Sequence, residues 1–253
     1  MKTTLKALFA LLMGVATIWS FEVPDVAYFQ APGFARIFLW HFPCPMLFTF
    51  LIIAGAWFSL RGFVNPKGFV PETDARLKAQ LDLKSVACME LGYLFALLTM
   101  ATGIMFSQIQ WGAWWSWDPR QTSFLMVLLV YAAYFSIRFG YTDPGKRAAF
   151  SSAYALFALG PALFLVFLFP HLPQIEQMSL HPSDSILGGK IKGEYAGCVI
   201  MILTLFMIMA VYLYNLRVRA GLAELELENY DERLDAGGNS APTGVVRPVS
   251  LPD

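Results

Sequence analysis

The chain has 253 residues, of which 57% are hydrophobic and only 14% are charged, and its mean hydropathy is +0.54. A soluble domain carries about a quarter charged residues, so this composition argues against a soluble protein and favours one that lies in a membrane. The formal net charge is zero. Bulk charge therefore points to no class of partner, and no nucleic-acid partner is expected.

Apolar runs long enough to cross a bilayer recur along the chain, and about 20 apolar residues suffice for one crossing. We predict an all-α, polytopic fold with six membrane-spanning helices, at about residues 5–21, 42–60, 85–106, 121–139, 149–169 and 195–216. Basic residues before the first run also fit a signal peptide, but no small-x-small cleavage site follows, so the run is kept as a span. Pro43 and Pro45 predict that the second span begins as an irregular segment at the membrane surface.

The segments between the spans are more polar. Residues 61–84 contain a turn signal, Asn65-Pro66-Lys67-Gly68, and a short amphipathic stretch near Thr73–Lys84. From about Gly221 the chain becomes acidic, and this stretch is able to continue the last helix. Residues 1–219 are therefore predicted to form one membrane domain, followed by a polar tail, 220–253, whose final fifteen or so residues are disordered.

The basic residues predict the orientation of the helices, because Lys and Arg gather in cytoplasmic loops. With a cytoplasmic N-terminus, fourteen of the 18 basic residues lie on the inner side. The outer side holds only four, Arg36, Arg120, Lys190 and Lys192. Both termini are then cytoplasmic, and the three outer loops, at about 22–41, 107–120 and 170–194, carry all three histidines of the chain.

Four of the seven tryptophans fall within the second outer loop, at Trp111–Trp117. An aromatic belt at the membrane interface explains an isolated tryptophan, but it explains poorly four indoles so close together. They predict a flat, apolar shelf that would hold a large planar hydrophobic ligand. The shelf residues expected to contact the ligand are Trp111, Gly112, Trp114, Trp115 and Trp117.

Asp118 follows this segment and fits the start of the fourth span. Asp118-Pro119-Arg120-Gln121 has the pattern of an N-cap, a proline at the first helical position, and a capping-box glutamine. This structural role is compatible with ligand binding, because it would fix the shelf rigidly to a helix end.

His41 and His181 are the candidate metal ligands, and His171 is ranked third because the prolines around it suggest a helix end. Both candidates lie beside outer helix ends that flank the tryptophan segment. Imidazole suits iron, and haem takes an axial ligand on each face. Zinc would need a third or fourth ligand, and the outer loops supply no clean set of Cys, His and carboxylate groups.

The cysteines carry no motif. Cys44, Cys88 and Cys198 make no C-x-x-C pair and are predicted to be small buried residues. The chain also has no P-loop, so any energy that the process needs is expected to come from another subunit.

Residues Trp111–Asp118 resemble the tryptophan-rich WWD signature of the haem-handling proteins of cytochrome c maturation. Length and six spans favour the haem exporter protein C (CcmC) family, whose next helix begins in a similar way to Asp118–Ser123. Leu39–Pro43 resembles that family's His-x-Pro, and Ser179–His181 resembles its Thr-Leu-His. The resemblance covers most of residues 1–219.

The resemblance implies a haem-handling protein with no catalytic residue, multi-pass in a bacterial inner membrane. Haem b, carried as cargo, would rest on the shelf and on Asp118 at the outer leaflet, with His41 and His181 as axial ligands. Arg120 and Arg36 would pair with its propionates, although anchoring to lipid headgroups is an equal alternative. Haem would pass to a periplasmic, CcmE-like haem chaperone, and ABC-type transporter subunits of the CcmA and CcmB kind would be partners.

Two other functions stay open. Asp118-Pro119 also resembles the CcsA type of cytochrome c synthetase subunit, which would attach haem itself, but such an enzyme needs a second large subunit. A generic transporter would show broken helices and buried charges at mid-membrane, and only Glu90 suggests one. The chain also departs from the resemblance at Glu176-Gln177, where the subfamily usually has a tryptophan pair, which makes the outer pocket more polar there.

Overall fold

The computed structural model describes residues 3–65, 68–69, 75–181, 189 and 191–236. Over these residues the chain is helical apart from one short β ladder, in which β1 (Val64–Asn65) pairs antiparallel with β2 (Gly68–Phe69). The predicted helical fold is therefore confirmed. The α-helices are α1 (Thr3–Glu22), α2 (Ile37–His41), α3 (Pro43–Phe63), α4 (Ala75–Trp111), α5 (Pro119–Gly140), α6 (Pro144–Leu163), α7 (Pro173–Glu176) and α8 (Gly193–Ala236).

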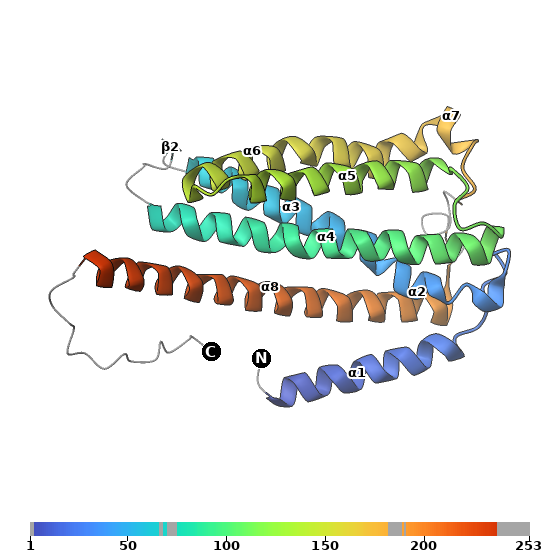
Figure 1. Ribbon diagram of the computed structural model, residues 1–253. Coiled ribbons are helices and arrows are strands. Elements are labelled where there is room, and N and C mark those ends of the chain that lie inside the picture. The colour runs from blue at the N-terminus through green and yellow to red at the C-terminus, as the bar shows by residue number, and fades with distance from the viewer. Residues whose placement is uncertain (1–2, 66–67, 70–74, 182–188, 190, 237–253) are drawn as a thin grey trace.

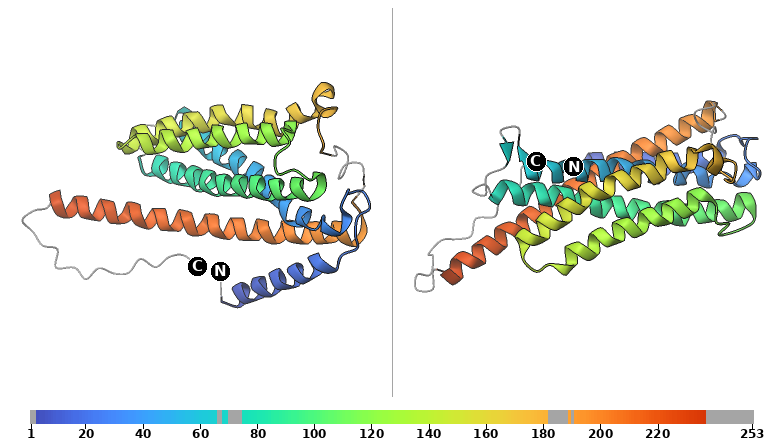
Figure 2. Two further views of the ribbon diagram at one scale, coloured as in Figure 1. Left: turned by 45° about the vertical axis from the view of Figure 1, so that its right-hand side comes forward. Right: turned by 90° about the horizontal axis from the view of Figure 1, so that it is seen from above.

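Within the described ranges, six helical segments are long and apolar enough to cross a membrane, as predicted. They run up and down in sequence order (Figure 1), and two further views show that they share one general direction (Figure 2). One end of the bundle holds α2, the connection from α4 to α5, and α7. We call it the histidine end, because His41, His171 and His181 all lie there. The opposite end holds the β ladder, the α5–α6 turn and the last turns of α8 (Figure 1).

Two helices extend well beyond the predicted spans. Helix α4 begins at Ala75, so most of the amphipathic stretch predicted near residues 73–84 is the first part of this helix. No proline or glycine occurs before Gly92 to interrupt it. Helix α8 continues to Ala236, and its extension beyond Gly221 contains no further proline or glycine. The predicted disorder over 237–253 lies outside the described residues.

The start of the second span also differs from the prediction. Helix α2 ends at His41, and α3 begins at Pro43 after Phe42, whose backbone is itself right-handed helical. Pro43 and Pro45 fall in the first turn of α3, where backbone N–H groups have no helical partner in any case. The prediction of an irregular segment was therefore wrong, and His41 is held in nearly continuous helix.

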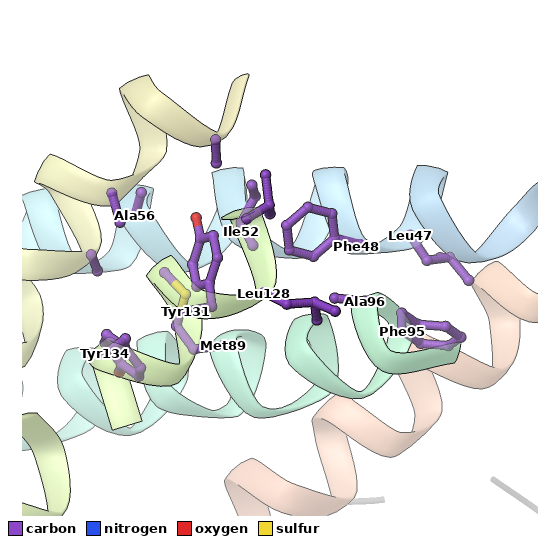
Figure 3. Packing of buried hydrophobic residues seen from close by; sticks show 14 of the residues in the cluster. Leu47, Phe48, Ile52, Ala56, Met89, Phe95, Ala96, Leu128, Tyr131 and Tyr134 are labelled. Atoms are coloured by element: carbon purple, nitrogen blue, oxygen red, sulfur yellow. The ribbon is translucent and has the colours of Figure 1, made fainter. Parts of the chain in front are cut away.

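The main hydrophobic core lies between α3, α4, α5 and α6, with α8 closing one side. Phe48 of α3 meets Tyr131 of α5 edge to face, with ring centroids 5.5 Å apart (Figure 3). Ile52 and Met89 lie in the same cluster. The predicted burial of the cysteines is confirmed for all three, Cys44, Cys88 and Cys198, which are free thiols.

Helices α3 and α4 approach closely at Gly55. A Cβ added there would lie 2.7 Å from Met89 Cε and 3.2 Å from Cys88 Cβ. Ser85 donates a hydrogen bond to the Gly55 carbonyl oxygen (2.9 Å), and its hydroxyl lies 2.8 Å from that of Ser59. Small residues four positions apart, here Gly55 and Ser59, are what lets membrane helices pack backbone to backbone.

Two ion pairs join α4 to its neighbours. Arg138 of α5 donates to both carboxylate oxygens of Asp82 (3.0 and 2.8 Å), and Arg217 of α8 donates to both oxygens of Glu90 (2.6 and 3.1 Å). Two-pronged pairing of this kind fixes geometry as well as charge. Glu90, the residue that suggested a transporter, is thus neutralised by a partner on a packed helix.

Helix α1 stands apart from the main core and packs on α8. Its buried residues are only Ala16 and Ser20, and most of its large apolar side chains face outward. Gly197 of α8 gives room to the Trp19 indole, since a Cβ there would lie 3.3 Å from that ring. An outward apolar surface of this extent is what lipid contact requires.

The segment between α1 and α2 is fixed from two sides. Arg36 donates to the carbonyl oxygens of neighbouring turns, including that of Gly33 at 2.6 Å, and pairs with Asp25 at 2.9 Å. From α4, Gln110 holds Ala31 with both ends of its amide, accepting from the backbone N–H (3.0 Å) and donating to the carbonyl oxygen (3.1 Å). This segment leads directly into α2 and so positions His41.

We expect Gly55→Leu to lower the stability of the protein in detergent by about 1–3 kcal/mol, the usual cost of overpacking a close interface. The measurement is the midpoint of thermal unfolding. Gly14→Leu on α1 is the control, because a Cβ at Gly14 meets nothing within 4 Å. Equal midpoints for both variants would contradict the close α3–α4 packing.

Candidate functional site

A cavity of about 180 Å³ lies among the helix ends at the histidine end. Its polar lining residues are His41, Thr99, Arg120, Gln121, Ser123 and His181. Apolar side chains such as Met100, Ile104 and Phe124 form the rest of the wall. The cavity therefore brings together residues from the first, second and third predicted outer loops, or from the helices beside them.

Helix α6 changes its winding where it reaches the cavity. Pro161 lies inside α6, a π-helical turn (η2, Phe164–Leu168) follows, and a 3-10 turn (η3, Phe169–His171) ends the segment. An internal proline removes a backbone donor, and single π turns recur at functional sites. Leu165 and Val166 of the π turn line the cavity. The distorted part of α6 is thus the part that forms the cavity wall.

His41 is held by Thr102 of α4. The Thr102 hydroxyl lies 2.6 Å from the Leu98 carbonyl oxygen and 2.8 Å from His41 Nδ1. Its single hydrogen is donated to the carbonyl, so the hydroxyl oxygen accepts from His41 Nδ1–H. This bond fixes the ring as the Nδ1–H tautomer and leaves the lone pair on Nε2 for a metal.

Gly103 makes room for the same ring. A Cβ at this position would lie 3.2 Å from His41 Cε1, tighter than side chains normally pack. The His41 ring also lies nearly parallel to that of Phe106, with centroids 6.4 Å apart. The imidazole therefore packs against Thr102, Gly103 and Phe106, which lie within about one and a half turns of α4.

His181 is held by Asp118. Its Nδ1 lies 2.9 Å from Asp118 Oδ1, and Trp111 packs edge-on against its ring with centroids 4.6 Å apart. Since an ionised carboxylate only accepts, Nδ1 carries a hydrogen, and in the neutral imidazole Nε2 is the nitrogen that keeps its lone pair. A carboxylate behind a histidine is the usual second partner of a metal-binding imidazole.

The Asp118 carboxylate is buried and fully bonded. Beside His181 it accepts from Arg120 N (2.8 Å), Ser179 Oγ (3.0 Å) and Leu180 N (2.6 Å). Burial by itself raises the pKa of Asp118, but the hydrogen bond and charge of His181, with the two backbone donors, outweigh it. The net result is a pKa well below the usual range, so the group is ionised at neutral pH.

The predicted N-cap is confirmed, while the capping box is not. Asp118 caps α5 through its bond to Arg120 N, with Pro119 in the first turn. Gln121 does not return to the backbone N–H of the cap; its Oε1 accepts from Ser116 N (3.2 Å) and Ser116 Oγ (3.1 Å). The reason is Trp117, whose left-handed backbone (φ 55°) turns the chain so that Ser116 faces Gln121.

The tryptophans do not form one flat shelf. Trp111 is half-buried against Phe106 and His181, whereas Trp114 and Trp117 are 59% and 74% exposed. Trp115 meets Trp117 edge to face, at an interplanar angle of 88°. The prediction of a single plane was therefore wrong, because Gly112 and Trp117 both have positive φ and turn the chain between the indoles. None of these residues lines the cavity itself.

Of the remaining candidates, Arg120 lines the cavity, whereas His171 and Arg36 do not. Arg120 Nη2 lies 3.4 Å from His171 Nε2, while His171 Nδ1 donates to the Phe167 carbonyl oxygen (2.9 Å). His171 thus supports Arg120 and does not line the cavity. Arg36 is bound into the segment after α1 and does not line it either.

Sequence reasoning identified both histidines, Asp118 and Arg120, but it missed three residues that shape the site. Thr102 and Gly103 hold the His41 ring, and Ser179 helps to bind Asp118. A threonine and a glycine inside an apolar span carry no local signal, because both are common in membrane helices for packing reasons alone.

The chain matches known proteins along most of its length. A family model described as "Heme exporter protein C" matches residues 1–231. The chain is 27% identical over 176 residues to the "Heme exporter protein C" of Paracoccus denitrificans, covering 66% of each chain. It is 27% identical over 155 residues to that of Rhodobacter capsulatus, covering 60% of this chain and 62% of that one.

A shorter stretch matches a second kind of protein. The chain is 40% identical over 70 residues to "Cytochrome c biogenesis protein CcsA" of Prochlorococcus marinus, which is 28% of this chain and 22% of that one. The match thus spans about a fifth of the CcsA relatives' length, and less than two thirds of the haem exporter proteins' length.

The six candidate spans among the described residues and the family match together define a multi-pass membrane protein. The chain belongs to the haem exporter protein C (CcmC) family.

We expect Asp118→Asn to lower the unfolding midpoint at pH 7, because one amide oxygen cannot replace a carboxylate that accepts four hydrogen bonds. The loss is about 1–3 kcal/mol. Folding lowers the pKa of Asp118 from its ordinary 3.8. The ionised carboxylate therefore contributes its full stabilisation above pH 3.8, and this stabilisation is lost as the pH falls from 3.8 through the folded pKa. The gap between the two proteins should therefore be wider at pH 7 than at pH 3.

The control for this comparison is Asp143→Asn, which changes an exposed N-cap that accepts from Lys146 N at 2.7 Å. At pH 7, Asp143→Asn should lower the unfolding midpoint by less than Asp118→Asn does. A gap for Asp118→Asn that stays constant between pH 7 and pH 3 would contradict the role given to the ionised carboxylate.

Proposed function

We propose that this protein holds haem at the outer face of a bacterial inner membrane and delivers it to a periplasmic haem chaperone for c-type cytochrome biogenesis. One observation carries the proposal. His41 and His181, far apart in the sequence, line the same cavity, and each has its Nδ1 bonded to a protein acceptor. Both Nε2 atoms are left as ligands, and two imidazoles are a donor set that suits haem iron.

The cavity supports a site that takes haem only in part. Its volume, about 180 Å³, is smaller than the roughly 300–1,000 Å³ of pockets that enclose drug-sized ligands. In our proposal the iron and the nearby ring atoms lie between the histidines. The rest of the ring extends over the exposed indoles of Trp114 and Trp117, with Gly112 and Trp115 in the same loop and Trp111 behind His181. A partly exposed cargo is one that a second protein is able to take.

Arg120 is the residue that we expect to meet a haem propionate. It lines the cavity, and guanidinium matches carboxylate geometry. Asp118, in contrast, acts through His181 and through the start of α5, without touching the cargo. The earlier expectation for Arg36 is dropped, because that residue already fixes the segment after α1.

The distribution of basic residues supports the proposed orientation of the protein in the membrane. Among the described residues, most Lys and Arg belong to helix ends and turns at the opposite end of the bundle, which supports a histidine end that faces the periplasm and termini that face the cytoplasm. The partners that we propose are a CcmE-like chaperone and CcmA- and CcmB-like transporter subunits. Haem b is the cargo, and its transfer is an exchange of ligands that requires no catalytic residue.

The local similarity to CcsA favours one second candidate, a subunit that attaches haem to apocytochrome itself. The two functions differ in the molecule that receives the haem. Haem-loaded protein should pass haem to a purified periplasmic chaperone and form no covalent adduct with an apocytochrome peptide alone. Thioether formation with the peptide, in the absence of any other protein, would favour the second candidate.

We expect the full-length protein, purified from haem-replete cells, to show a haem Soret band with a six-coordinate, low-spin spectrum. His41→Ala and His181→Ala should each abolish the low-spin signature, and added imidazole should restore part of it. His171→Ala is the matched control, because His171 contacts Arg120 and does not line the cavity. An unchanged spectrum in both ligand variants would refute the axial assignment, and a wild-type protein that binds no haem would refute the proposed function.

Thr102→Val tests the hydrogen bond behind His41. Without an acceptor for Nδ1–H, the ring loses its fixed tautomer, and haem affinity should fall about tenfold, the lower bound for loss of such a partner. The control is Thr204→Val, because the Thr204 hydroxyl bonds only its own helix at Ile200 (2.8 Å). Equal haem affinities for the two variants, measured by titration in detergent, would contradict the role of Thr102.

A further inference from the structure

Gln121 lines the cavity and has only the oxygen of its amide bound to described residues. The residue is only 7% exposed. Its Oε1 accepts two hydrogen bonds from Ser116, but its Nε2 is buried and makes no hydrogen bond to any residue that the structure describes. A buried amide donor without an acceptor is unfavourable, and such a group in a cavity wall calls for an explanation.

Rotating the Gln121 side-chain amide by 180° would not give Nε2 an acceptor. Ser116 presents its backbone N–H to Gln121 Oε1 at 3.2 Å, and a flipped amide would place its own NH₂ group against that donor. The orientation of the side chain is therefore set by the tryptophan segment, and Nε2 must point away from it. No described residue supplies an acceptor for Nε2, and Gln121 lines the cavity, which is the space where a ligand acceptor would lie.

The surroundings define the chemistry of that acceptor. Arg120 lies next to Gln121 and lines the same cavity, so a cation and a neutral NH₂ donor face one space. The Ser123 hydroxyl, also in the lining, donates its hydrogen to the Arg120 carbonyl oxygen (3.2 Å), so it does not add a further donor to the cavity. A guanidinium and an amide donor together match a carboxylate, which accepts only.

We propose that Gln121 is a cargo-binding residue, whose Nε2 donates to a carboxylate of the bound porphyrin beside Arg120. The inference rests on the proposed function and adds to it a specificity for porphyrins with free acid groups. It also gives Gln121 a second task, since the same amide holds Ser116 and hence the turn between Trp115 and Trp117. Binding of the acid group and the arrangement of the indoles are thus coupled through one side chain.

The test is a pair of titrations, with ferric haem and with its dimethyl ester, on the full-length protein in detergent. The wild type should prefer the free acid. Gln121→Glu keeps an acceptor for Ser116 but replaces the NH₂ donor by a carboxylate oxygen, so the preference for acid over ester should fall at least about tenfold, as expected for a hydrogen bond to a charged group. Gln121→Met, which adds no charge, should lower the preference in the same direction and serves if the first variant does not fold.

Gln110→Glu is the matched control, because Gln110 is also buried at the histidine end and both groups of its amide are hydrogen-bonded to Ala31. It should reduce stability and leave the preference for acid over ester unchanged. An undiminished preference in both Gln121 variants would overturn the inference while leaving the proposed function intact. Failure of the wild type to bind either porphyrin would overturn the proposed function, and this inference with it.

Discussion

The buried carboxylate of Asp118 connects three parts of the histidine end that are separate in the sequence. It accepts from the first turn of α5, from the Ser179-Leu180 segment and from the imidazole of His181. Burial alone would favour its neutral form, and only this number of donors keeps it ionised. The tryptophan segment that precedes it, the helix that follows it and the second histidine are therefore fixed relative to one another by one group.

The two histidines are held by different partners, and the difference matters chemically. His41 donates to a neutral hydroxyl inside a helix, whereas His181 donates to an anion in a connecting segment. A carboxylate raises the basicity of its imidazole more than a hydroxyl does. In the proposed function, two ligands of unequal strength, one on a packed helix and one in a connecting segment, suit a site whose cargo must both bind and leave.

The rest of the molecule gives this end a rigid support. The close contact at Gly55 and the ion pairs of Asp82 and Glu90 lock α3, α5 and α8 to α4. At the histidine end the backbone is irregular at the π turn of α6, which lines the cavity, and at the left-handed Trp117. In a membrane, such irregularity is tolerated where protein or a cavity covers it.

The sequence by itself determined the helical class, the six spans, the cap at Asp118 and the pair of histidines, because each leaves a local mark: apolar length, capping pattern, or a rare residue type at a helix end. It also pointed to the tryptophan segment, although not to its shape. Only the tertiary structure decided that Thr102 and Asp118 fix the two imidazoles, that His171 supports Arg120, and that the indoles face different ways. Those relations depend on the approach of segments far apart in the chain and on two left-handed backbone positions, and neither leaves a periodic or compositional trace in the sequence.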